Sequence, residues 1–491
     1  MYKTVQLLLV IIHRTILLAV TFVVGSLIFA KIEHISYERS GFFCWTVVTT
    51  IGYGKIVPIT NWGKIFTMIY GIIGISITMF CLVSYGSFLN HCIKKLIVAT
   101  ERYCCTNKQV AYLHFKLFIA LFLLGISEVF LGGYVLYELN DWSFFYSVYT
   151  WFVSISTIGF GDFVPNFPPE KNIVKLFVVV VFHFFCIVTF ASVIEAIQGM
   201  VESVNNNSRG VWSIIFCCYK NEEYKIKRDS NSSLVTNHNA EMDKTAQLFL
   251  VIVHRSYLLA VTFVVGTLIF AEIEHITYER SGFFCWTVVT TIGYGAPVPS
   301  TYWAKIFTMI YGIIGIPITM FCLVSYGSFL NHCIKKLIVA TERCCCTNKQ
   351  VAYLHFKLFI ALFLLGISEM FLGGCALYGL NDWSFLDSLY TWFVSISTIG
   401  FGDFVPNFPP EKNIVKLILI VVIHFFCMVT FTSVIEAIQG MVESVNNNSR
   451  GVWPIIFCCY KNEEKESYKI QRESNSSLIT NQNEMEEDIY L

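Results

Sequence analysis

The stretch SISTIGFGDFVP, residues 154–165, decides how this 491-residue chain folds, because it recurs without change as residues 395–406. A shorter related stretch, TTIGYG, occurs as residues 49–54 and again as residues 290–295. Each copy has a threonine followed by glycines two and four positions later. Glycine at alternate positions permits backbone conformations that a Cβ atom would resist. Four copies of this pattern indicate one shared structural task.

The four copies belong to an internal repeat that covers the chain. A shift of 241 residues superposes Met1–Cys218 on Met242–Cys459 without a gap. The repeat predicts two tandem units, 1–241 and 242–491, with a linker from residue 201 and a disordered cytosolic tail from about residue 446. Met242 lies opposite Met1, so the joining of two adjacent reading frames is the alternative to a genuine fusion.

The composition predicts a membrane protein. Hydrophobic residues make up 55% of the chain and charged residues 14%, against about a quarter charged in soluble domains. Each unit has four apolar segments close to the ~20 residues that cross a bilayer. The predicted spans are Thr15–Ile32, Ile65–Leu89, Phe115–Tyr137, Ile173–Met200, Ser256–Ile273, Ile306–Leu330, Phe356–Tyr378 and Ile414–Met441.

Shorter apolar segments that end in the glycine motifs lie between these spans. They are too short to cross and predict re-entrant pore loops near residues 42–54, 145–161, 283–295 and 386–402. The predicted fold class is therefore an all-α membrane protein with eight transmembrane helices and four re-entrant pore loops in two tandem repeats. Lysines and arginines gather in His91–His114 and in the linker, which predicts cytosolic termini.

The motif residues suit coordination of a dehydrated potassium ion. Rings of backbone carbonyl oxygens from four loops replace the water that the ion loses, and the threonine hydroxyl adds a further oxygen. The C-terminal ends of the short helices before the loops would favour a cation. The predicted selectivity-filter residues are Thr50, Ile51, Gly52, Tyr53, Gly54, Thr157, Ile158, Gly159, Phe160, Gly161, Thr291, Ile292, Gly293, Tyr294, Gly295, Thr398, Ile399, Gly400, Phe401 and Gly402.

Charged residues flank the predicted filter. Asp162 and Asp403 follow two of the loops and are expected to raise the local potassium concentration, whereas Lys55 follows the first loop and would oppose this. Lys55 extending into water without such an effect is the alternative. No cofactor is expected apart from the permeant potassium ion, and the only predicted metal site is the filter itself.

Four ionisable residues are predicted inside the spans: Glu128, His183, Glu369 and His424. Because such residues are costly in a membrane, they are candidates for gating, and the histidines for proton sensing. Neutral histidines bonded to a neighbouring helix are the alternative.

Each unit resembles a subunit of the two-pore-domain potassium channel family. The matching stretches are Gly25–Glu33, Thr49–Gly54, Gly63–Ile75 and Ser156–Pro165. The resemblance covers nearly the whole chain apart from the tails. It implies a potassium leak conductance across a plasma membrane, with the filter at the twenty positions given above.

Two departures from that family affect the expected assembly. Its members resemble one unit and dimerise, whereas this chain already holds four loops, so we predict a self-sufficient single-chain pseudo-tetramer, with a homodimer as the alternative. The long extracellular cap of the family has no room between Glu33 and Gly41.

Other function classes stay open or are disfavoured. A four-repeat potassium transporter and a non-conducting regulatory channel subunit are the rival functions. No enzyme motif occurs outside the loops, and a formal net charge of zero gives no argument for nucleic acid. The expected partners are the lipid bilayer and potassium ions.

Overall fold

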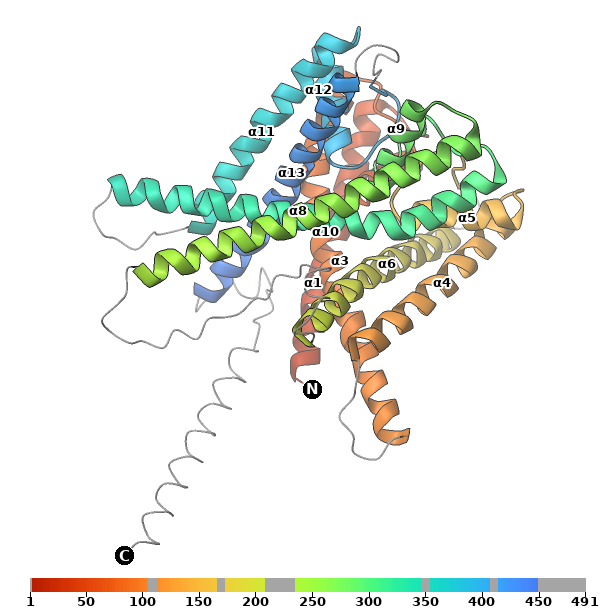
Figure 1. Ribbon diagram of the computed structural model, residues 1–491. Helices are drawn as coiled ribbons and strands as arrows, with labels where there is room; N and C mark the ends of the chain where they lie inside the picture. The colour runs from red at the N-terminus through yellow and green to blue at the C-terminus, as the bar shows by residue number, and fades with distance from the viewer. Residues whose placement is uncertain are drawn as a thin grey trace, which may run out of the picture.

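The computed structural model describes residues 2–104, 113–165, 173–207, 235–345, 354–406 and 414–448. These residues form helices joined by turns and short loops, and no strand occurs among them. Figure 1 shows long helices gathered side by side, with short ones at one end of the bundle. The predicted all-helical fold class is confirmed.

The two units repeat one order of elements, long, short, long, long, short, long. The first unit consists of α1 (Tyr2–Glu33), α2 (Tyr37–Val48), α3 (Asn61–Cys104), α4 (Leu113–Leu139), α5 (Phe144–Ile155) and α6 (Ile173–Asn207). The second consists of α8 (Val235–Glu274), α9 (Tyr278–Val289), α10 (Tyr302–Cys345), α11 (Leu354–Leu380), α12 (Phe385–Ile396) and α13 (Ile414–Asn448).

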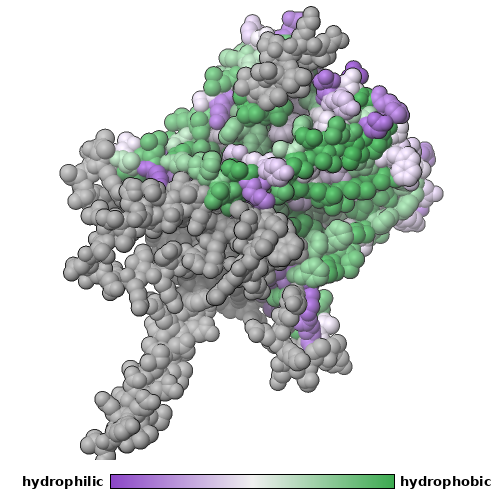
Figure 2. Space-filling view, in the orientation of Figure 1, coloured by the Kyte–Doolittle hydropathy of each residue, from purple (hydrophilic) through white to green (hydrophobic). Residues whose placement is uncertain are grey.

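Within the part of the chain that the structure describes, eight helices are long and apolar enough to cross a membrane: α1, α3, α4, α6, α8, α10, α11 and α13. A 27-residue helix such as α4 rises about 40 Å, which exceeds the ~30 Å hydrocarbon core. Large apolar side chains such as Leu27, Phe130 and Leu372 point outward from these helices. Figure 2 accordingly shows a broad hydrophobic face over the part of the bundle where α8 lies. The chain is therefore built as a multi-pass membrane protein.

The short helices α2, α5, α9 and α12 have 12 residues each, too few to span a bilayer. Serine starts three of them, and its hydroxyl caps a backbone N–H of the first turn, as Ser384 does for Asp387 at 3.1 Å. Each short helix begins with an exposed aromatic residue, such as Tyr37 or Tyr278, but several aromatic residues further along are buried, with Tyr149 and Tyr390 both 0% exposed. The short helices thus form the centre of the fold.

Around this centre, helices pack both within each unit and between the two units. Within a unit, α1 packs on α2 and α3, and α4 packs on α5 and α6; α8 to α13 repeat these pairings. Between units, α3 packs on α12 and α10 packs on α5. Each unit therefore completes the surroundings of a short helix that belongs to the other unit.

Two details differ from the sequence-based predictions. The helix α3 continues to Cys104 and α10 to Cys345, so residues expected in cytosolic loops, including Lys94 and Lys95, are helical. The predicted linker is also partly helical, because residues 201–207 lie in α6 and residues 235–240 lie in α8. The remaining residues of the predicted linker and tail, 208–234 and 449–491, lie outside the described residues.

Candidate functional site

The backbone after each short helix folds back onto that helix. The N–H groups of Ile51 and Gly52 both donate to the carbonyl oxygen of Thr46, at 3.0 and 3.2 Å. The same pair of bonds joins Ile158 and Gly159 to Val153, Ile292 and Gly293 to Thr287, and Ile399 and Gly400 to Val394. Because the N–H groups turn toward the short helix, the loop carbonyl groups are left to face other partners.

Backbone dihedral angles in the loops alternate in sign. Thr50, Gly52 and Gly54 have φ of 57°, 56° and 70°, and the equivalent residues of the other three loops have φ between 55° and 75°. A positive φ is rare for a β-branched residue and carries a strain of about 1–3 kcal/mol, which tends to persist where the surroundings enforce it. All four loops carry this strain at the same threonine: Thr50, Thr157, Thr291 and Thr398.

The glycines show which loops are neighbours. A Cβ atom on Gly52 would overlap the carbonyl oxygen of Ile399, and one on Gly159 would overlap that of Ile51. In the same way Gly293 faces the carbonyl of Ile158, and Gly400 that of Ile292. Each loop therefore touches the next, and the fourth touches the first, so the four loops form a closed ring.

A second ring of contacts lies one step further along the loops. Cβ atoms added to Gly54, Gly161, Gly295 and Gly402 would meet the carbonyl oxygens of Phe401, Tyr53, Phe160 and Tyr294, in the same cyclic order. The loops thus bring carbonyl groups together in fours, at two levels. Rings of carbonyl oxygens are the kind of coordination that potassium filters use for a dehydrated monovalent cation.

The aromatic residue of each loop lies against the next short helix around the ring. The Tyr53 hydroxyl donates to Ser154 Oγ on α5, and the Tyr294 hydroxyl to Ser395 Oγ on α12. Phe160 stacks on Phe284 of α9 with ring centroids 5.4 Å apart, and Phe401 stacks on Phe43 of α2 at the same separation. Hydroxyl-bonded and purely apolar contacts therefore alternate around the ring.

The predicted outer residues lie at the ends of the loops. Asp162 accepts a hydrogen bond from the Tyr149 hydroxyl at 3.0 Å, and Asp403 accepts one from Tyr390 at 2.9 Å. Burial raises the pKa of the Asp162 carboxyl above its ordinary value, although the Tyr149 hydrogen bond opposes this. Lys55 is exposed directly after the first loop.

Two lysines missed by the sequence analysis lie beside these aspartates. Lys64, at the start of α3, pairs with Asp387 of α12, and its Nζ lies 4.9 Å from the Phe404 ring centroid. Lys305, at the start of α10, donates to the Pro299 carbonyl, and its Nζ lies 5.4 Å from the ring centroid of Tyr149. Their signal in the sequence was a lysine within an otherwise apolar helix.

The predicted intramembrane carboxyl groups join long helices. Thr189 Oγ1 donates to Glu128 Oε1 at 3.0 Å, between α6 and α4. Thr430 makes the same bond to Glu369 at 3.1 Å, between α13 and α11. The structure thus places both glutamates between helices and not in the ring of loops. His183 and His424 lie against tryptophans of the short helices. A gating role for these four residues stays a prediction.

Comparison with known proteins agrees with this geometry. A family profile described as "Ion channel" matches four times, at residues 14–91, 124–202, 257–332 and 357–440. Each match contains one glycine motif. These matches cover more than half of the chain, so the chain belongs to this ion channel family. Family membership indicates a channel and not an enzyme.

Two curated relatives are potassium channels. "TWiK family of potassium channels protein 7" of Caenorhabditis elegans is 31% identical over 174 residues, which is 30% of this chain and 31% of the relative. Human "Potassium channel subfamily K member 1" is 35% identical over 138 residues, 26% of this chain and 38% of the relative. The aligned region thus spans about a third of the length of each relative.

Proposed function

We propose that this chain is a potassium-selective, leak-type channel in which the four loops form one selectivity filter. The observation that carries the proposal is the closed cyclic order of the loops, in which each glycine faces the isoleucine carbonyl of its neighbour. Four such carbonyl groups at each of two levels supply oxygens in place of the hydration shell of the ion. The names of both curated relatives support potassium as the ion.

The proposal includes an assembly in which one polypeptide makes one pore. Loops from both units alternate in the ring, and helices from each unit pack on short helices of the other. We further propose two subunit-like channel units of the two-pore-domain type, in the plasma membrane with cytosolic termini. The lysine and arginine distribution of the sequence supports this orientation.

The test uses the full chain purified and reconstituted in liposomes. Potassium flux far above sodium flux, at rates of a channel and not of a transporter, is the expected result. Equal passage of sodium and potassium, or no passage by intact protein, would contradict the proposal. Single-molecule bleaching of a chain with one fluorescent tag should show one tag for each conducting complex, and two tags would favour the homodimer.

A glycine substitution tests the filter itself. Gly293→Ala places a Cβ atom against the Ile158 carbonyl at a φ of 55°, so we expect loss of potassium flux. Gly379→Ala on α11 is the matched control, because no atom lies within 4 Å of the added Cβ, and its flux should equal that of the unmodified chain. Normal flux in the Gly293→Ala protein would remove this loop from the filter.

A further inference from the structure

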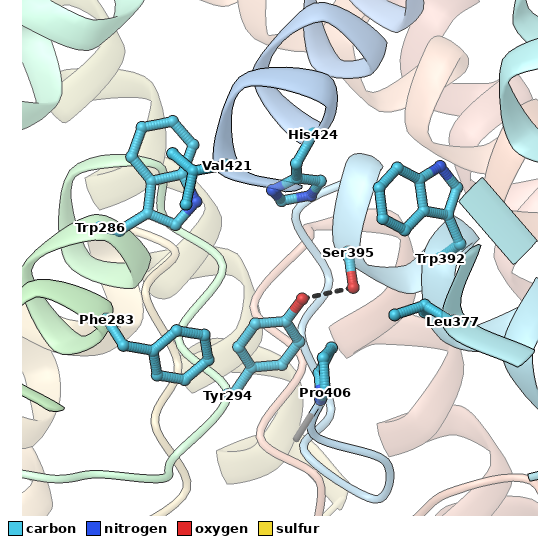
Figure 3. A pocket seen from close by; sticks show the side chains of 9 residues that line it. All are labelled: Phe283, Trp286, Tyr294, Leu377, Trp392, Ser395, Pro406, Val421 and His424. Carbon is cyan, nitrogen blue, oxygen red and sulfur yellow. Dashed lines mark hydrogen bonds between the residues drawn. The ribbon is translucent and has the colours of Figure 1, made fainter. Parts of the chain in front are cut away.

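A histidine of the last long helix lies behind the tyrosine-containing loop of the second unit. His424, on α13, is buried, and its ring centroid lies 5.6 Å from that of Trp392 on α12 and 6.3 Å from that of Trp286 on α9. Figure 3 shows these rings around a small cavity that the Tyr294 and Ser395 side chains also line. The histidine thus meets two short helices and one loop of the ring.

Hydrogen bonds connect this histidine to the filter. The His424 imidazole is bonded to the backbone of Ser395, while its Nε2 has no partner among the described residues, which assigns the bond to Nδ1. A neutral imidazole whose Nδ1 bonds a carbonyl oxygen carries its proton there. His424 therefore acts as a donor to the last turn of α12.

Ser395 is the meeting point of three elements. Its hydroxyl accepts from Tyr294 of the third loop and donates to the Thr391 carbonyl at 2.6 Å. Its carbonyl accepts from the N–H of Thr398, the first filter residue of the fourth loop, at 3.1 Å. Through Ser395, His424 thus reaches two neighbouring loops of the ring.

The first unit repeats the arrangement. His183 of α6 is buried, its ring centroid lies 5.2 Å from that of Trp151 and 6.3 Å from that of Trp45, and its imidazole is bonded to the Ser154 backbone. The Ser154 hydroxyl accepts from Tyr53 of the first loop. The same chain of contacts therefore occurs twice around the ring, half a turn apart.

The two phenylalanine-containing loops cannot make this hydrogen-bonded contact, because the residues that it needs are different there. Three residues before the filter threonine, where α5 and α12 have serine, α2 and α9 have Val47 and Val288. The neighbouring loops there carry Phe160 and Phe401, which stack on phenylalanine rings. A phenol thus meets a serine hydroxyl, and a plain phenyl ring meets an apolar helix, at alternate positions.

We infer that His183 and His424 are positioning residues of the selectivity filter, which tie the fourth long helix of each unit to the tyrosine-containing loops through Ser154 and Ser395. The inference rests on the proposed channel function. The position of α6 and α13 then contributes to ion selectivity, because a displaced serine releases both a tyrosine hydroxyl and the first residue of the adjacent loop.

The test measures ion selectivity, as the reversal potential between potassium and sodium in bilayers that hold the full chain. Replacing both histidines by leucine removes the donor to each serine, so the sodium-to-potassium permeability ratio should rise at least about fivefold, which is the effect expected from the loss of a single hydrogen bond. Replacement of both by asparagine, whose amide nitrogen lies near the Nδ1 position, should restore selectivity. Replacement of both by glutamine, whose nitrogen lies near Nε2, should not.

A double-mutant cycle separates positioning from general packing. In a Tyr53→Phe, Tyr294→Phe background the hydroxyl bonds are already absent and only the bonds from Thr157 and Thr398 to the serine carbonyls remain, so adding the two leucine substitutions should raise the permeability ratio by less than fivefold. A full-sized further rise would overturn the inference, as would unchanged selectivity of the leucine variant or equal rescue by asparagine and glutamine. If the leucine variant fails to fold, the asparagine and glutamine pair decides alone.

The two proposals fail in different ways. An unmodified chain that passes sodium as readily as potassium contradicts the channel proposal and this inference together. An unmodified chain that is selective for potassium, with histidine variants that are equally selective, contradicts only the inference.

Discussion

The two interfaces between the units are equivalent by repeat position and differ in chemistry. We call α3 against α12 the ionic interface, because Lys64 pairs there with Asp387. We call α10 against α5 the aromatic interface, because Phe145 contacts Tyr302 there with ring centroids 4.0 Å apart. The residue at the Asp387 position of the first unit is Tyr146, whose ring centroid lies 5.6 Å from Lys305 Nζ.

The difference shows what duplication within one chain allows. In a homodimer both interfaces have the same sequence, whereas here each interface can change independently. The ring of loops keeps one geometry although the ionic and aromatic interfaces beside it differ. Contacts between backbone atoms form the ring, whereas side chains form the two interfaces. The following experiments test whether the two interfaces contribute differently.

The largest expected effect is that of Lys64→Met. It leaves the Asp387 carboxylate without its cationic partner in a mostly buried site, so we expect a loss of about 2 kcal/mol in the free energy of unfolding, between the values for exposed and fully buried pairs. Lys305→Met is the matched control and should cost less, because Lys305 donates to backbone carbonyl groups. Thermal unfolding in detergent provides the measurement, and equal losses would abolish the distinction between the interfaces.

The pair also predicts a pH dependence. Burial opposes the charge of Asp387, but the hydrogen bonds from Lys64 and Ser384 hold its pKa below the ordinary value. Its contribution to stability is therefore complete above the ordinary aspartate pKa and is lost as the pH falls through the lowered value. Acid unfolding curves of the unmodified chain and of Asp387→Asn should converge in that range, and parallel curves down to the lowest pH would contradict this.

The substitution Phe145→Leu tests the contribution of the aromatic interface. It introduces the residue that the ionic interface has at the equivalent position, Leu386. Loss of the ring contact with Tyr302 should lower the free energy of unfolding by about 1 kcal/mol. The reverse substitution, Leu386→Phe, should not raise the free energy of unfolding, because the position equivalent to Tyr302 holds Asn61 and offers no partner ring. A gain of similar size would show that the partner ring is unimportant.

The aspartates at the ends of the loops, Asp162 and Asp403, extend the comparison of the two interfaces to ion conduction. Asp162→Asn should reduce single-channel conductance at low salt about twofold, and Asp403→Asn should reduce it less. Lys305 beside Asp162 is bonded to carbonyl groups, so its positive charge would repel potassium once the Asp162 charge is removed. Lys64 on the other side is already neutralised by its paired carboxylate. Since the pKa of Asp162 is raised, conductance should also begin to fall at an external pH above the range of an ordinary aspartate. Identical effects of the two variants would contradict this.

The smallest expected effect is that of ionic strength. Raising choline chloride from 0.15 M to 1 M should weaken the ionic interface by a few tenths of a kcal/mol and leave the aromatic interface unchanged. The difference between the unmodified chain and Lys64→Met should shrink accordingly, while the cost of Phe145→Leu stays constant.

Much of the fold could be predicted from the sequence, because its signals are local. Apolar runs such as Phe115–Tyr137 predict a span wherever they occur, and the repeat of 241 residues doubles every such prediction. Helix ends were less predictable. The continuation of α3 to Cys104 includes charged residues such as Lys94 and Lys95, which favour a loop by composition yet are compatible with a solvent-facing helix.

The candidate site divides in the same way. The glycine motifs marked all four loops, since alternate glycines are a local requirement of the backbone. Lys64 and Asp387 were not recognised as partners, because 323 residues separate them and no local pattern links them. The alternation of Tyr53 and Phe160 in the loops with Val47 and Ser154 in the short helices was visible in the sequence, but only the packing shows that each aromatic residue faces the next helix.

By itself, the sequence determined eight apolar helices, two units and four glycine loops, since hydrophobicity and backbone freedom are properties of each segment alone. Only the tertiary structure decided the cyclic order of the loops, the ionic and aromatic interfaces, and the contact of His424 with Ser395. These depend on which surfaces of distant segments meet, and side-chain complementarity across the closed ring sets that choice.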